Sequence, residues 1–194
     1  STVFLDGLGY PTGVMAWRNG VIVTTAPEVF YAEDTNGDGK ADLHESLYTG
    51  FGEGNQQHRV NGLRWGLDNW IYLANGDSGG DLVSTKTGEK LNLSRRDLRI
   101  RPDTGLMDAQ SGQTQFGRER DDWGNWFGSN NSNPAFHYAL ADHYLRRNKD
   151  LIAPDPKVQV SIQPGAATIF PVSRTQERFN DLNKVNRITS ACGL

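Results

Sequence analysis

The sequence contains little cysteine, no long apolar run and no strongly basic segment, and each shortage excludes a class of protein. The only cysteine is Cys192, so an internal disulfide and the cysteine-based zinc and redox motifs are excluded. We expect this thiol to be buried and structural. No apolar run approaches the ~20 residues that a helix needs to cross a bilayer. The net charge of -3 argues against nucleic acid as a partner.

Helix signals and a targeting segment are also lacking. The best helical candidate is Pro134–Leu145, which could equally be an irregular connection. No segment has the features of a signal peptide. The sequence opens on STVFLDGLGYPTG, which is typical of the interior of a protein. We therefore expect residues 1–194 to be one domain and a fragment of a larger exported protein.

Glycine and aromatic residues are the most informative part of the composition. The chain has 22 glycines and 10% aromatic residues, and 36% of its residues are hydrophobic. Many glycines and aromatics without long apolar runs are typical of short strands joined by tight turns. The composition therefore predicts an all-β fold.

Three segments share one pattern, namely Gly13–Val23, Gly62–Tyr72 and Gly117–Phe127. In each, a glycine is followed by a turn signal and then by a bulky apolar pair at the same offset. The pairs are Ile22-Val23, Ile71-Tyr72 and Trp126-Phe127. A tight turn followed by apolar residues predicts a β-hairpin in each segment.

The spacing of the three hairpins indicates a repeat architecture. Their starts lie about 50 to 55 residues apart, a period typical of propeller blades. Val29–Ala32 and Leu98–Arg101 are expected to be outer strands. The pattern predicts a partial β-propeller over residues 1–194, with about three to four blades. An irregular antiparallel sandwich is the alternative.

An acidic loop lies between the first two hairpins. Counted from Asp34, its oxygen-bearing residues follow the calcium-loop template, with glycine at the sharp turn. The predicted ligands are Asp34, Asn36, Asp38, the Lys40 carbonyl, Asp42 and Glu45. The β-branched and aromatic residues on both sides indicate strands, where an EF-hand would have helices. We expect a structural calcium site, and a solvated acidic turn is the alternative.

His58 is the main catalytic candidate. It lies in the polar segment Asn55–Asn61, a few residues ahead of the second hairpin. In a propeller this position is close to the central axis, where ligands bind. A histidine there could act as a general base near neutral pH. The alternative is a structural histidine that is bonded to a neighbouring carbonyl.

The residues around the second hairpin resemble the signature of soluble quinoprotein glucose and sorbosone dehydrogenases. The matching positions are His58, Gly62-Leu63, Gly66, Asp68, Ile71-Tyr72 and Gly76-Asp77. That family has six-bladed propellers and uses pyrroloquinoline quinone (PQQ). The resemblance implies that His58 takes the proton of a sugar or alcohol hydroxyl while hydride passes to the quinone. It also makes Gln57, Arg59 and Asn61 the candidate cofactor-binding residues.

A second resemblance covers most of the chain. The segments that carry it are PTGVMAWRNGVIVTTAPEVFYAEDTNGDGKAD, GFGEGNQQHRVNGLRWGLDNWIYLANGDSGG, QFGRERDDWGNWFGSNNSNP and NRITSACGL. They resemble a membrane-bound dehydrogenase family of planctomycete-type bacteria. Those proteins are large and exported, and their propeller is often followed by a c-type cytochrome domain. The resemblance implies a periplasmic or cell-envelope location and a c-type cytochrome as electron acceptor.

The chain departs from the quinoprotein pattern in its third repeat. Gln113 and Gln115 stand where an Arg-Asn pair is expected, and Arg59 and Arg118 are the candidate substitutes. Two hypotheses therefore stay open. One is a PQQ-type sugar or alcohol dehydrogenase propeller with a structural calcium loop. The other is a non-catalytic, calcium-stabilised propeller that binds glycan or protein.

Overall fold

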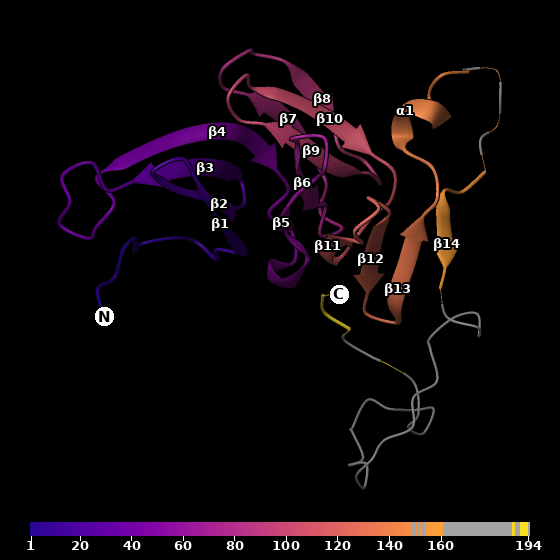
Figure 1. The fold of residues 1–194 in the computed structure, drawn as a ribbon, viewed down its shortest axis with the longest axis horizontal. Helices are drawn as coiled ribbons and strands as arrows, with labels where there is room; N and C mark the ends of the chain where they lie inside the picture. Colours follow the sequence, from indigo (N-terminus) through magenta and orange to yellow (C-terminus); the bar gives the residue numbers. More distant parts are fainter. Residues whose placement is uncertain (149, 151, 153, 161–187, 189–190, 194) are drawn as a thin grey trace, which may run out of the picture.

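The computed structural model describes residues 1–148, 150, 152, 154–160, 188 and 191–193. These residues form an all-β fold of three antiparallel sheets, which follow one another in chain order across Figure 1. The all-β prediction is confirmed. Most of the NRITSACGL segment lies outside the described residues. No helix in the described part of the chain is long and apolar enough to span a membrane.

The first sheet has six strands in the order β1-β2-β3-β4-β7-β8. The strands are β1 (Gly13–Trp17), β2 (Gly20–Thr25), β3 (Glu28–Glu33), β4 (Leu43–Phe51), β7 (Gly80–Ser84) and β8 (Lys90–Asn92). The first four form a meander. The β7–β8 hairpin comes later in the chain and adds to this sheet because β7 pairs with β4, with Thr49 opposite Val83.

The other two sheets have four strands each. The second sheet has the order β10-β9-β6-β5, and the third has the order β11-β12-β13-β14. The second consists of β5 (Asn61–Trp65), β6 (Ile71–Ala74), β9 (Asp97–Arg101) and β10 (Leu106–Gln110). The third consists of β11 (Phe116–Arg120), β12 (Trp126–Asn130), β13 (Asn133–Tyr138) and β14 (Lys157–Gln159). The two helical elements described are η1 (Gln56–His58) and α1 (Asp142–Leu145).

The three predicted hairpins are β1–β2, β5–β6 and β11–β12, and each is antiparallel. Their turns contain Arg18, Asn69 and Gly124, which all have positive φ. The segments expected to be outer strands are strands β3 and β9, and each lies between two other strands of its sheet. The local turn signals therefore located the hairpins correctly.

The helical candidate Pro134–Leu145 is wrong over most of its length. Its first half is strand β13, and only Asp142–Leu145 is helical. Phe136 and Tyr138 are buried on one face of the strand, as the two-residue period of a strand requires. Pairing with β12 on one side and β14 on the other therefore outweighs the weak helical signal.

The first strand of each sheet lies beside the first strand of the next. β1 contacts β5, and β5 contacts β11. The approach is closest at Gly62, where an added Cβ would lie 2.9 Å from Gly117 Cα. Gly62 also has a φ of +66°, which favours glycine. This packing brings the residues that precede β5 and β11 into one region.

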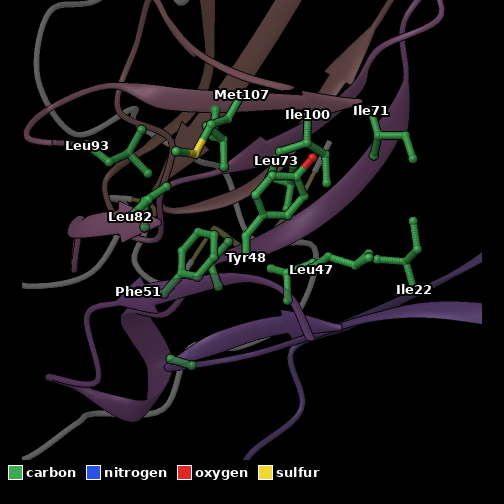
Figure 2. Close-up of a cluster of buried hydrophobic side chains, with 14 of the residues drawn as sticks. Ile22, Leu47, Tyr48, Phe51, Ile71, Leu73, Leu82, Leu93, Ile100 and Met107 are labelled. Carbon is green, nitrogen blue, oxygen red and sulfur yellow. The ribbon is translucent and has the colours of Figure 1, made fainter. Parts of the chain in front are cut away.

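The main hydrophobic core lies between the first and second sheets (Figure 2). Tyr48 and Phe51 of β4 face Leu73 and Ile100 of the second sheet. Three of these side chains are completely buried, and Phe51 is 3% exposed. Tyr48 also donates a 3.1 Å hydrogen bond to the Leu106 carbonyl. This core fixes the two sheets relative to each other, and with them the ends of their strands.

Candidate functional site

A polar cluster forms where the chain enters β5 and β11. We use this name for His58, Asp77, Gln113 and Gln115. His58 ends η1 just before β5, and Asp77 follows β6. Gln113 and Gln115 immediately precede β11. The cluster therefore joins residues that are far apart in the sequence, through the packing of the second and third sheets.

The closest contact in the cluster joins the side chains of His58 and Gln115. Their Nε2 atoms are 2.7 Å apart. Gln115 Oε1 accepts a 2.8 Å hydrogen bond from the Asn131 backbone N–H, which turns the amide nitrogen toward His58. An amide nitrogen can only donate, so His58 Nε2 accepts and the neutral ring carries its proton on Nδ1. The Gln115 amide thus occupies the hydrogen-bonding position at the Nε2 lone pair of His58.

The backbone around His58 is held by short-range contacts. Asn55 caps η1, because its side chain accepts a 3.0 Å hydrogen bond from the Gln57 N–H. Ser78 donates its hydroxyl to the His58 carbonyl. The Phe116 ring stands edge-on to the imidazole, at 6.3 Å between centroids. The imidazole is half-buried. Its backbone is held by Ser78 and by the Asn55 cap of η1.

Asp77 adds a carboxylate to the cluster. Partial burial of this carboxyl raises its pKa, which a hydrogen bond from Gln113 opposes. Its φ of +72° belongs to the tight turn that follows β6. The cluster therefore contains a base and a carboxylate within electrostatic range of each other.

Two of the predicted cofactor-binding residues are engaged within the protein. Asn61 Nδ2 donates to the Arg59 and Gln115 carbonyls at 2.8 and 2.9 Å, and its Oδ1 accepts from the Gly117 N–H at 2.8 Å. Arg59 is buried, donates to the Glu53 carbonyl at 2.9 Å and lies over the Tyr10 ring. Asn61 therefore ties β5 to β11, and Arg59 anchors the preceding loop.

A cavity of about 470 Å³ lies next to the polar cluster. Its lining residues are Thr12, Gln56, Gln57, Arg59, Asn61, Phe116, Asn131 and Cys192. The three predicted cofactor-binding residues thus share one cavity, whereas His58 faces Gln115. Cys192 is exposed, so the expectation of a buried thiol is wrong. Its segment lies at the surface, where Ala191 donates its N–H to the Asn131 carbonyl.

A buried ion pair holds the backbone that leads to two members of the cluster. The sequence did not predict this pair. Arg118 of β11 and Asp97 of β9 are 2.6 Å apart, and their side chains are 2% and 0% exposed. Asp97 also accepts hydrogen bonds from the N–H groups of Asn75 and Thr114, both at 2.9 Å. These two backbone positions lead directly to Asp77 and Gln115.

The Arg118 side chain therefore lies in the interior of the protein. Its guanidinium lies 4.6 Å from the centroid of the Tyr138 ring and 5.3 Å from that of Trp126. It also donates a 2.7 Å hydrogen bond to the Ser111 carbonyl. The substitution of Arg118 for a missing quinone ligand would require breaking these contacts. No local sequence signal marks this pair, since Asp97 and Arg118 are 21 residues apart.

The acidic loop connects two strands, β3 and β4, as predicted. Asp34 accepts hydrogen bonds from the N–H groups of Gly37 and Gly39. Asp42 accepts from the Thr35 N–H at 2.9 Å and from Asn36 Nδ2 at 2.8 Å. These bonds lower the pKa of both carboxyls, chiefly through the Gly39 N–H for Asp34 and the Thr35 N–H for Asp42. These bonds therefore favour the ionised forms of Asp34 and Asp42.

The predicted calcium ligands are only partly gathered. Asn36 and Asp38 accept from the N–H groups of Asp38 and Lys40, while Glu45 lies on β4. In the described part of the chain, no group of three His, Cys, Asp or Glu side chains is placed to hold a metal. The calcium template also uses an amide and a backbone carbonyl, and each bonded carboxylate oxygen retains a lone pair. The donor set is therefore compatible with calcium.

One comparison with known proteins gives a family. A family model described as "Domain of unknown function (DUF7133)" matches residues 1–194. The chain belongs to the DUF7133 family. Searches of curated proteins and of solved structures found no match to it. The comparisons therefore give the family of this DUF7133 chain, and evidence for its function comes from its residues and their contacts.

The quinone implied by the resemblance can be tested against the residues of the DUF7133 chain. PQQ carries three carboxylates, so its cradle needs cationic groups with free donors. Arg118 donates to the Ser111 carbonyl and pairs with Asp97 inside the protein. Arg59 also lines the cavity; one of its terminal nitrogens donates to the Glu53 carbonyl, and its Nε has no hydrogen-bond partner. Among the described residues that line the cavity, Arg59 is therefore the one cation that could hold a quinone carboxylate.

Proposed function

We propose that the chain forms part of a β-propeller, with about three to four blades of a six-bladed ring. The proposal is supported by three successive meanders and by the side-by-side packing of their first strands. In a propeller those strands surround the axis, and each blade is a four-stranded antiparallel sheet. The β7–β8 hairpin is then an insertion between the second and third strands of the second blade.

We propose that this propeller belongs to a sugar or alcohol dehydrogenase in which His58 is the general base. The observation that carries the proposal is the His58 Nε2 lone pair, which accepts from a hydrogen-bond donor 2.7 Å away in a polar cluster with a carboxylate. A hydroxyl in place of the Gln115 amide would give its proton to Nε2. The oxidation also requires a hydride acceptor, and PQQ supplies that chemistry when it is bound.

Arg59, which lines the cavity, is the cationic candidate for the quinone cradle, because Arg118 is buried in its pair with Asp97. As the resemblance implies, the parent protein is exported to the periplasm or cell envelope. Its electrons pass to a c-type cytochrome domain or partner. Calcium in the acidic loop has a structural role, since the loop joins two strands and lies in another sheet than His58.

The second candidate is a non-catalytic, calcium-stabilised propeller that binds glycan or protein. It is favoured by one observation: Asn61 and Arg118 are engaged within the protein, which leaves Arg59 as the one cation among the described residues that line the cavity. Under this hypothesis His58 is a structural histidine and Gln115 is its permanent partner. The two candidates differ in whether the full-length protein binds a quinone.

A quinone titration and one variant separate the two candidates. We expect calcium-loaded full-length protein to show a spectral change on titration with PQQ and to reduce a dye with a sugar or alcohol donor. His58→Gln should abolish dye reduction, because the amide cannot accept the proton, and should leave quinone binding intact. His44→Ala removes an exposed histidine of β4 and is the control. No spectral change at saturating PQQ would favour the non-catalytic candidate.

A further inference from the structure

The end of the hairpins opposite His58 carries two exposed tryptophans and an exposed leucine. Trp65, Leu67 and Trp123 are 40%, 63% and 84% exposed. They lie at or next to the turns of β5–β6 and β11–β12, whereas His58 precedes β5. A five-residue strand spans roughly 17 Å, which separates this end from the polar cluster. Nothing in the proposed reaction uses these side chains.

A groove of about 280 Å³ lies beside these aromatic residues. We call it the far-end groove, and its lining residues are Trp65, Asn69, Arg101, Pro102, Asp103 and Thr104. It is formed by the β5–β6 turn and by the β9–β10 turn of the same sheet. Its volume is close to the lower limit of small-molecule sites, ~300 Å³. A ligand about the size of one or two sugar rings fits it better than a protein interface, which needs ~800 Å² from each partner.

The two charged side chains that line the far-end groove have opposite signs. Asp103 forms an ion pair with Arg18 of the β1–β2 turn. Arg101 donates a 3.0 Å hydrogen bond to the Asp68 carbonyl and lies 4.6 Å from the centroid of the Trp70 ring. One positive and one negative group line the groove, so its lining has no net formal charge. Its chemistry suits a neutral ligand.

The backbone beside the groove is held by two contacts. Arg120 of β11 donates a 2.8 Å hydrogen bond to the Trp65 carbonyl, which ties the end of β5 to the third sheet. A Cβ built on Gly124 would lie 3.3 Å from Leu67 Cδ1, so the two hairpin turns touch. Because the backbone that carries Trp65 is held, a ligand that binds at its ring does not have to order a loop. Exposed aromatic side chains on a rigid frame are typical of binding sites.

We propose that the far-end groove binds a neutral carbohydrate. A sugar ring has an apolar C–H face and a rim of hydroxyls. The indole of Trp65 provides an apolar surface for that face, and Asn69, Asp103 and Thr104 provide hydrogen-bonding groups for the rim. The groove lies at the far end of β5 from His58. This inference therefore does not depend on the dehydrogenase proposal.

Affinity electrophoresis of the full-length protein tests the proposal. The gels contain a neutral polysaccharide (starch, xyloglucan, laminarin or galactomannan) or the anionic alginate as a comparison. We expect retardation by at least one neutral polysaccharide and none by alginate. Trp65→Ala should remove most of that retardation, and Trp65→Phe should keep part of it because it retains a ring. Tyr144→Ala, which removes an exposed aromatic residue on α1, should have no effect.

Two further variants keep the test decisive. Asn69 has a φ of +60°, so Asn69→Gly removes its amide without backbone strain and should weaken retardation with the fold intact. His58→Gln should keep full retardation, which separates this site from the catalytic proposal. The proposal is overturned if no neutral polysaccharide retards the protein, if alginate alone does, or if Trp65→Ala and Asn69→Gly both behave like the wild type.

Discussion

At the scale of single residues, Asp97 determines where the polar cluster forms. Its Oδ1 accepts from the N–H groups of Asn75 and Thr114, and its Oδ2 pairs with Arg118. A buried carboxylate is stable only when it is paired and hydrogen-bonded in this way. Asp97 therefore fixes two loops of different sheets at once. One of them carries Asp77 and the other carries Gln115.

Gly62 provides a test of the close packing between first strands. Gly62→Ala should destabilise the protein by ~2 kcal/mol or more. The alanine would have to keep the left-handed backbone of Gly62, and its Cβ would lie 2.9 Å from Gly117 Cα. Gly88→Ala is the matched control, since Gly88 has a φ of +71° and open space around it. Urea unfolding measures both. Equal losses in the two variants would show that β5 and β11 are not in close contact.

His58 illustrates how far single-residue prediction could go. The sequence identified it through its polar neighbours and its place before a hairpin. Its partner Gln115 lies 57 residues away, so no local pattern could show the contact. For the same reason the sequence could not show what Asn61 and Arg118 bind, because their partners belong to other strands.

At the scale of elements, the acidic loop should respond to calcium. Removal of the ion with EDTA should lower the melting temperature of the full-length protein, and re-addition of calcium should restore it, because a ligand that binds only the folded state stabilises it. Asp38→Asn should weaken the response, since it removes one ligand charge. Asp81→Asn, which alters an exposed carboxylate on β7, is the control. A melting temperature that changes with neither EDTA nor calcium would contradict the prediction of a calcium site.

The same loop should also make calcium-free protein sensitive to acid. The folded pKa values of Asp34 and Asp42 lie below the ordinary 3.8, because backbone N–H groups stabilise their ionised forms. Their contribution to stability is therefore complete above about pH 4 and is lost as the pH falls through the lower folded values. Unfolding of the Asp34→Asn, Asp42→Asn double variant should show a smaller loss in that range. An identical acid profile for wild type and variant would contradict this.

The sequence predicted elements well where the signal was local. Turn residues located the three hairpins, and the flanks of the acidic loop correctly indicated strands. It could not show that β7–β8 joins the first sheet, because that choice depends on pairing with β4. It also left Pro134–Leu145 as either a helix or an irregular connection, whereas pairing with β12 and β14 makes the first half of this segment strand β13.

At the scale of the whole molecule, the three sheets give the chain two functional ends. The first and second sheets share a hydrophobic core (Figure 2), and the second and third are joined by the Asp97–Arg118 pair. Because the sheets are fixed together, the loops before β5 and β11 meet at one end and the hairpin turns meet at the other. The polar cluster and the far-end groove both result from this arrangement.

The most direct measurement of the central claim is chemical rescue of His58→Ala in the full-length protein. Loss of a general base should lower dye reduction by ~10²–10⁴-fold. Added imidazole should restore part of that rate at unchanged melting temperature, because it can occupy the vacated site beside Gln115. A variant with wild-type activity, or one whose lost activity imidazole does not restore, would contradict the assignment of His58 as the base.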